Sequence, residues 1–106
     1  MPSKWRCFEV TLPMAFNDGR PVPRKWLGKA LREVVEHFGG GHLQPQPIVG
    51  EWPHKGTIYR DKAVKLIVDV PETTANRRWM KQFKQRWKEK LQQLELWMVS
   101  YRIELE

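Results

Sequence analysis

The chain has 106 residues, a formal net charge of +7 and a single cysteine, Cys7, so an intrachain disulfide and a four-cysteine zinc site are excluded. This is the length of one domain, and we expect a single α+β domain over residues 1–106. No run approaches the roughly 18 apolar residues of a membrane span, and the N-terminus lacks the apolar stretch of a signal peptide, so we expect a cytoplasmic protein without membrane contact.

Residues 6–12 alternate between apolar and polar side chains, which predicts a half-buried strand. The turn-forming run Asn17-Asp18-Gly19 predicts a loop after this strand. Residues 24–38 then carry apolar side chains at helical spacing and predict an amphipathic helix that ends at Gly39. The apolar stripe on this helix consists of Leu27, Leu31, Val34 and Phe38.

The middle of the chain predicts a hairpin. Pro45 and Pro47 each remove a backbone donor, so residues 43–52 are expected either as an edge strand or as an extended loop. Residues 53–56 form a predicted turn, and residues 57–70 a long strand. One face of this strand carries Val64, Leu66, Val68 and Val70.

The last third of the chain predicts a helix and a final strand. Asn76 is a suitable N-cap, and we expect the helix over residues 77–93. Its expected buried side consists of Met80, Phe83, Trp87, Leu91 and Leu94. Residues 97–105 alternate again, which predicts the strand.

The predicted order of strand, helix, strand, strand, helix and strand is that of a ferredoxin-like βαββαβ sandwich. Such a sandwich has a four-stranded antiparallel sheet with two helices on one face. On the uncovered face we expect Trp5, Cys7, Thr11, Ile67 and Met98. This set is too apolar to stay exposed, so we expect a homodimer that packs two open sheet faces together.

The positive charge is concentrated in residues 76–90, which carry seven Lys/Arg and one Glu, while the other ninety-one residues sum to +1. The basic side chains expected on the outer face of this helix are Arg77, Arg78, Lys81, Lys84 and Lys88. One interpretation is a solvated face that keeps the protein soluble. The other is a binding surface for nucleic acid or an acidic protein, because rows of Lys and Arg release counterions from phosphates.

Our leading expectation is therefore a non-enzymatic binding or accessory protein that presents a basic helix to an acidic partner. The aromatic motif of an RNA-recognition module is missing from the predicted central strands, so the helix is the better candidate for nucleic acid.

An alternative site lies near the predicted hairpin turn. Its residues are Trp52, His54, Tyr59, Arg60 and Asp61. Arg60 would bind an anion and an aromatic ring would stack on the ligand, which suits a small dimeric ligand-binding protein or enzyme. These residues are equally compatible with hairpin packing, in which Arg60 pairs with Glu51. A third alternative is a protein–protein interaction module with a Trp-rich surface.

No catalytic residue, metal site or cofactor is predicted. Asp61 and Asp69 lie eight residues apart on one predicted strand, too far to share Mg²⁺. His37, His42 and His54 lack the paired spacing that is typical of zinc ligands. Cys7 has no neighbour in sequence that would lower its pKa, so we interpret it as a small strand residue.

The segments FNDGRPVP, FGG, GEW, TIYRDK, VDVPETTANRRW and LQQLELWMVSYRIELE resemble those of a group of short, uncharacterised bacterial proteins. The resemblance covers nearly the full length and implies a single intact domain. It implies no activity, ligand or catalytic residue.

Overall fold

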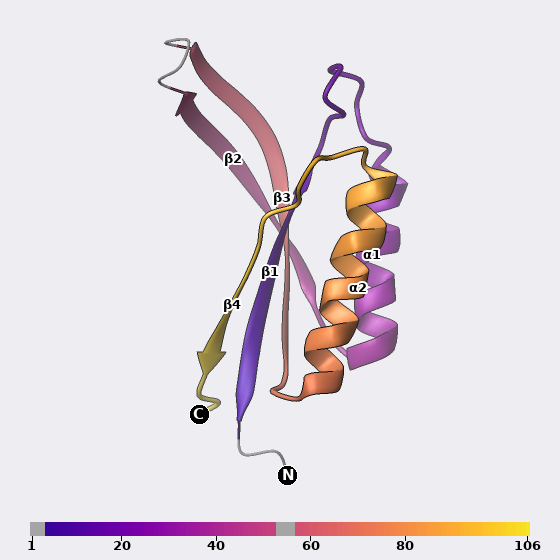
Figure 1. Ribbon diagram of the computed structural model, residues 1–106, viewed down its shortest axis with the longest axis vertical. Coiled ribbons are helices and arrows are strands. Elements are labelled where there is room, and N and C mark those ends of the chain that lie inside the picture. Colours follow the sequence, from indigo (N-terminus) through magenta and orange to yellow (C-terminus); the bar gives the residue numbers. More distant parts are fainter. Residues whose placement is uncertain (1–3, 53–56) are drawn as a thin grey trace.

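A computed structural model describes the backbone of residues 4–52 and 57–106 and the side chains of residues 4–45 and 63–106. Its elements are, in chain order, β1 (Trp5–Pro13), α1 (Arg24–Phe38), β2 (His42–Trp52), β3 (Thr57–Pro71), α2 (Thr74–Lys90) and β4 (Met98–Ile103). The strands form one antiparallel sheet in the order β2-β3-β1-β4. Both helices cover the same face of this sheet (Figure 1). The predicted ferredoxin-like α+β sandwich is confirmed.

The hydrophobic core lies between the sheet and the two helices. Every second side chain of β1 and β3 points into it, from Phe8 to Leu12 and from Val64 to Val70, and all of these are buried. From the helices, the fully or nearly buried side chains are Leu27, Ala30, Val34, Met80, Phe83 and Trp87. Trp87 also donates its indole Nε1–H to Glu33 Oε2 at 2.9 Å, so its polar atom is satisfied and α2 is linked to α1.

The β2–β3 hairpin extends beyond the other two strands. Its backbone pairing runs from His42 opposite Ile67 to Trp52 opposite Thr57, whereas β1 pairs with β3 only from Ala63 to Pro71. The far half of the hairpin therefore projects from the sheet as a two-stranded arm (Figure 1). The two prolines of β2 lie on the sheet's edge strand, where proline is tolerated because its nitrogen can face solvent. Of the two predicted forms of this segment, the structure therefore has the edge strand.

The bounds predicted for the second helix are wrong by three residues at each end. Thr73 is the N-cap, because its Oγ1 accepts from the backbone N–H of Asn76 at 3.0 Å. Asn76 instead donates its side-chain amide to the Pro71 carbonyl at 2.8 Å. The helix ends at Lys90, and Gln92 adopts a φ of 56° just after it.

The early end of α2 changes which leucine is buried. Leu94, predicted on the buried side of the helix, lies in the connection to β4 and is 96% exposed. Leu96 is 2% exposed and joins the core in its place. The prediction for Leu94 is wrong because the helix ends at Lys90, so the helical spacing does not continue to residue 94.

The uncovered face of the sheet matches the prediction except at β4. Trp5, Cys7, Thr11 and Ile67 lie on it, as expected from the register of β1 and β3. Met98 does not, because it pairs with Val10 and packs against the core. Alternation identifies the residues that share a face of β4, and only the pairing with β1 determines which face the helices cover. In the described part of the chain, neither helix is long and apolar enough to cross a membrane.

Candidate functional site

Five polar or ionisable side chains meet on the open face of the sheet, and we call them the open-face polar group. Cys7 lies on β1 between Asp69 of β3 and Tyr101 of β4. The group consists of Cys7, Glu9, Lys65, Asp69 and Tyr101. They share one face because residues two apart on a strand point the same way and antiparallel partners lie opposite each other.

Glu9 is the centre of this group. The Tyr101 hydroxyl donates a hydrogen bond to Glu9 Oε2, and Lys65 Nζ donates to Oε1 at 3.2 Å. These two hydrogen bonds, that of Tyr101 first, lower the pKa of Glu9 below its ordinary value. Glu9 is therefore a carboxylate at neutral pH, suited to binding a cation or a hydroxyl group rather than to accepting a proton.

The phenol of Tyr101 and the thiol of Cys7 both have raised pKa values and stay protonated. Hydrogen bonds with Cys7 and Glu9 raise the pKa of Tyr101, so its phenol is neutral at physiological pH. Burial raises the pKa of the Cys7 thiol, which is only 4% exposed. A buried thiol with a raised pKa is a poor nucleophile, which agrees with our interpretation of Cys7 as a strand residue.

Apolar side chains surround the open-face polar group. Trp5, Ile67, Val99 and Ile103 lie on the same face and are partly exposed. The open-face polar group is thus framed by apolar side chains on the face of the sheet that neither helix covers (Figure 1). Among the described residues, no three His, Cys, Asp or Glu side chains lie close enough to hold a metal ion.

The predicted basic face of α2 divides into paired and unpaired residues. Arg77 forms an ion pair with Glu72 at 3.0 Å, and Lys84 forms one with Glu95 at 2.9 Å. Within the part of the chain that the structure describes, Arg78, Lys81 and Lys88 form no ion pair. Part of the predicted face is thus structural. Binding of nucleic acid or an acidic protein to the rest stays a prediction.

The side chains of the predicted hairpin site lie outside the described residues. The β2–β3 arm includes the backbone of Trp52, Tyr59, Arg60 and Asp61, whereas His54 falls within residues 53–56. The predicted pairing of Arg60 with Glu51 is likewise untested. Of the two other histidines, His37 stacks on Trp79 with ring centroids 4.3 Å apart, and His42 begins β2.

The sequence analysis did not predict that the five side chains of the open-face polar group meet. Alternation places Cys7 and Glu9 on one side of β1 and Tyr101 on one side of β4. Their meeting depends on the register of β1 with both neighbours, which no local pattern contains. The available signal was the topology, since a ferredoxin-like order places β1 between β3 and β4.

A comparison with solved structures finds the same fold in two phage enzyme structures. A phage SAM lyase in complex with S-methyl-5′-thioadenosine has a TM-score of 0.69 and 11% sequence identity, over 100% of this chain and 93% of the other. A phage SAM lyase in the apo state has a TM-score of 0.65 and 13% identity, over 98% and 92% of the two chains. No family model matches the chain, and no curated protein matches its sequence.

These structures correct our leading expectation. Both neighbours are enzymes that match this chain over 98% or more of its length, so the expectation of a non-enzymatic protein presenting a basic helix is overturned. The alternative drawn from the sequence, a small ligand-binding protein or enzyme, is the better supported. At this level of identity the likeness shows the fold alone, so the ligand must be argued from this chain's own residues.

Proposed function

We propose that this chain is a small enzyme or ligand-binding protein for S-adenosylmethionine (SAM) or for S-methyl-5′-thioadenosine. The full-length likeness to a SAM lyase structure that contains S-methyl-5′-thioadenosine supports this proposal. The observation in this chain that carries it is the open-face polar group, in which Cys7 lies between Asp69 and Tyr101 and the Tyr101 hydroxyl donates to Glu9.

The chemistry of the group fits such a ligand. SAM carries a sulfonium and an ammonium cation, a carboxylate, two ribose hydroxyls and an adenine ring. Carboxylates such as Glu9 and Asp69 bind ammonium and hydroxyl groups through charge-assisted hydrogen bonds. The exposed ring of Tyr101 offers a face for a cation or for adenine, and the surrounding apolar side chains offer further contact to an adenine ring.

The loss of positive charge on the sulfur during the reaction indicates whether Glu9 and Asp69 act in binding or in catalysis. When the bond between sulfur and the amino-acid chain breaks, both bonding electrons stay on sulfur, and the sulfonium becomes a neutral thioether. A carboxylate held against the sulfur would stabilise the charged substrate more than the transition state. We therefore assign Glu9 and Asp69 to binding the ammonium and hydroxyl groups. A lyase adds no water, so the carbon that sulfur leaves forms its new bond within the same fragment: the fragment's own carboxylate oxygen supplies the electron pair, and no proton is transferred.

The test is to incubate the purified protein with SAM and to measure S-methyl-5′-thioadenosine by chromatography, with calorimetric titration of both compounds alongside. Glu9→Gln is expected to raise KM about tenfold while kcat changes little, because it removes an interaction made equally in substrate and transition state. If the protein only binds, the same variant raises Kd by a similar factor.

The matched control is Glu36→Gln, which removes an equally charged carboxylate from the exposed side of α1. It should leave both constants unchanged. Absence of turnover together with absence of binding of either compound would refute the proposed function. An equal effect of the two variants would show that net charge, and not the open face, is responsible.

We further propose that the protein is a homodimer through the open sheet face. The supporting observation is the partly exposed apolar frame of Trp5, Ile67, Val99 and Ile103, which a second copy would cover. The open-face polar group lies on the same face, so in such a dimer its ligand would bind between the two protomers. Light scattering at micromolar concentration should give twice the chain mass of 12.7 kDa. Ile103→Arg should yield the monomer, and a monomeric wild-type protein would contradict the proposal.

A further inference from the structure

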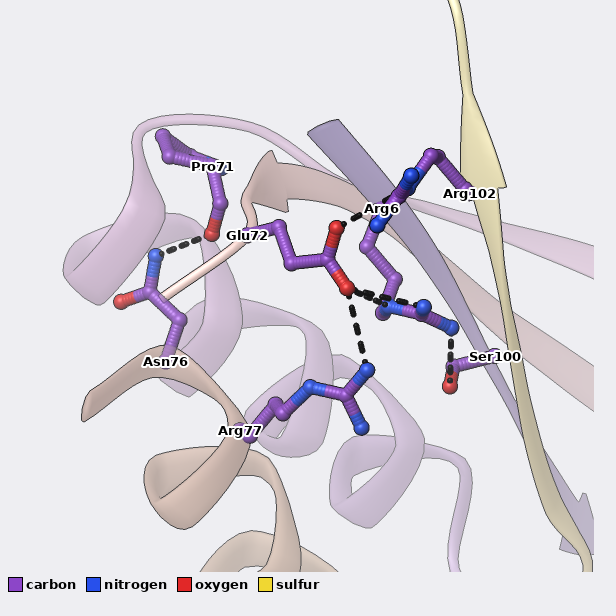
Figure 2. Close-up of polar contacts among 7 residues, drawn as sticks. All are labelled: Arg6, Pro71, Glu72, Asn76, Arg77, Ser100 and Arg102. Carbon is purple, nitrogen blue, oxygen red and sulfur yellow. Dashed lines mark hydrogen bonds and ion pairs between the residues drawn. The ribbon is translucent and has the colours of Figure 1, made fainter. Parts of the chain in front are cut away.

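A second polar cluster lies at the end of the sheet where β1 and α2 begin (Figure 2). Its centre is Glu72, the residue between the end of β3 and the N-cap of α2. We call it the Glu72 cluster, and it consists of Arg6, Glu72, Arg77, Ser100 and Arg102. Figure 2 shows the three guanidinium groups directed at the one carboxylate from three different elements.

The contacts of the cluster saturate the carboxylate. Arg6 donates from Nε to Glu72 Oε1 at 3.0 Å, and its Nη2 lies 2.8 Å from the same oxygen. Arg77 Nη2 donates to Oε1 at 3.0 Å, and Arg102 Nε donates to Oε2 at 3.2 Å. Hydrogen bonds with Arg77 and then Arg6 lower the pKa of Glu72 to about 2. Glu72 is therefore ionised at every physiological pH, and the cluster carries a net charge of +2.

The three arginines differ in what they have left to donate. Arg6 uses Nε and Nη2 on Glu72 and Nη1 on Ser100 Oγ at 3.1 Å, and its side chain is only 15% exposed. Arg77 and Arg102 each engage one nitrogen within the described residues, and their side chains are 44% and 58% exposed. A guanidinium has five N–H donors, so both present unused donors to solvent.

A purely structural role accounts for Arg6 but not for the other two arginines. The largely buried contacts of Arg6 with Glu72 and Ser100 already connect β1, β4 and the start of α2. Arg102 lies directly opposite Arg6 in the β1–β4 ladder, and like charges in that position repel. One carboxylate compensates one guanidinium, so adding Arg77 and Arg102 leaves an excess that a second anion would neutralise.

The start of α2 adds to the positive potential. This helix has 17 residues, no acidic residue in its first turn, and an N-terminus beside Glu72. The partial positive charge of a helix N-terminus favours an anion there. It acts together with the side chains of Arg77 and Arg102.

We propose that Arg77 and Arg102, held in place by Glu72, bind a compact dianion of the phosphate class. A charge of −2 matches the excess of the cluster, and tetrahedral phosphate oxygens match two planar guanidinium edges better than a single carboxylate does. Arg102 comes from β4, so this site differs from the predicted basic face of α2. It lies on the other side of the sheet from the open-face polar group, and it does not depend on the proposed function.

The test is calorimetric titration of the purified protein with inorganic phosphate at low ionic strength and constant chloride. Arg77→Gln and Arg102→Gln should each weaken phosphate binding about tenfold, since each removes a charged hydrogen-bond donor. Arg78→Gln is the matched control: it makes the same charge change at the adjacent, exposed position of α2, outside the cluster. It should bind phosphate as the wild type does. Circular dichroism checks that all three variants are folded.

Two further arms identify the class and source of the anion. Glycerol phosphate that binds more tightly than inorganic phosphate would place the dianion on a larger molecule, and the reverse order would favour the free ion; both results support the site. Acetate that binds as tightly as phosphate would overturn the dianion class. Absence of phosphate binding, or equal weakening by Arg78→Gln and Arg102→Gln, would overturn the site itself.

Discussion

Glu9 and Glu72 both contact side chains of the sheet, on its two opposite faces. Glu9 accepts hydrogen bonds from one phenol and one ammonium group, and Asp69 adds a second carboxylate nearby. Glu72 accepts hydrogen bonds from three guanidinium groups. In the first region carboxylates outnumber cations, and in the second cations outnumber carboxylates. The same residue type thus centres two surfaces of opposite charge, and the number of paired cations decides which ligand each attracts.

The comparison also limits what each carboxylate can do. Both pKa values are lowered, so neither group is a proton acceptor near neutral pH. Glu72 has its oxygens occupied by arginines and acts as a support for them. Glu9 accepts one hydrogen bond at each oxygen, so it has acceptor capacity left for a ligand. Position in a network, rather than residue type, separates a supporting carboxylate from a ligand-binding one.

The largest effect on stability is expected from Glu72→Gln. This substitution leaves the mostly buried Arg6 without its carboxylate partner, while Arg102 still lies directly opposite Arg6 in the sheet. The unfolding temperature at pH 7 should therefore fall more than for any one arginine substitution. The pKa of Glu72 is lowered on folding from 4.5 to about 2. Its contribution is therefore complete above about pH 4.5 and is lost as the pH falls through about 2.

Thermal unfolding of the wild type and Glu72→Gln from pH 8 to pH 2 measures this difference. The gap between their midpoints should be constant above pH 5 and should narrow below it. Glu95→Gln is the control, because it also removes a carboxylate, but an exposed one that forms a single ion pair, with Lys84. A gap that persists unchanged at pH 2 would show that the charge of Glu72 is not the cause.

An intermediate effect on stability is expected from Arg6→Gln. Comparing it with Arg102→Gln distinguishes the structural arginine from a ligand-facing one. Arg6→Gln should destabilise the fold by about 2 kcal/mol, since it removes charged hydrogen bonds in a mostly buried setting. Arg102→Gln should cost less than about 0.5 kcal/mol, because its pair with Glu72 is exposed on the arginine side. Urea unfolding at pH 7 compares the two. Equal costs would mean that Arg102 is as structural as Arg6 and would weaken the case for an anion site.

Most of the fold follows from local patterns in the sequence. The helix at Arg24–Phe38 was predicted with its bounds, because its apolar stripe and its terminal glycine both indicate them. The second helix was displaced because Thr73 and Asn76 are both capable N-caps, and the contact of Asn76 with Pro71 depends on where β3 ends. Local rules rank capping residues by type, whereas the tertiary structure selects between them.

The two polar regions could not be predicted in the same way. Each depends on contacts between residues far apart in the sequence, 94 positions for Arg6 with Ser100 and 92 positions for Glu9 with Tyr101. The distribution of charge along the sequence identifies the basic segment of α2. It does not show that Arg77 and Lys84 pair with acidic residues from neighbouring segments. Charge patterns report composition along the chain, and these sites depend on strand register and on the end of β3.

The smallest effect is expected from Tyr101→Phe, which tests the other half of the comparison. Removal of the hydroxyl takes away the main cause of the lowered pKa of Glu9, so this pKa should rise toward its ordinary value with little change in stability at pH 7. A ¹³C NMR titration of the Glu9 carboxyl carbon measures the shift. Lys65→Met should give a smaller rise, since its hydrogen bond is the second cause. A larger rise for Lys65→Met would mean that the ammonium group, rather than the phenol, holds Glu9, and the two regions would then both be cation-paired carboxylates.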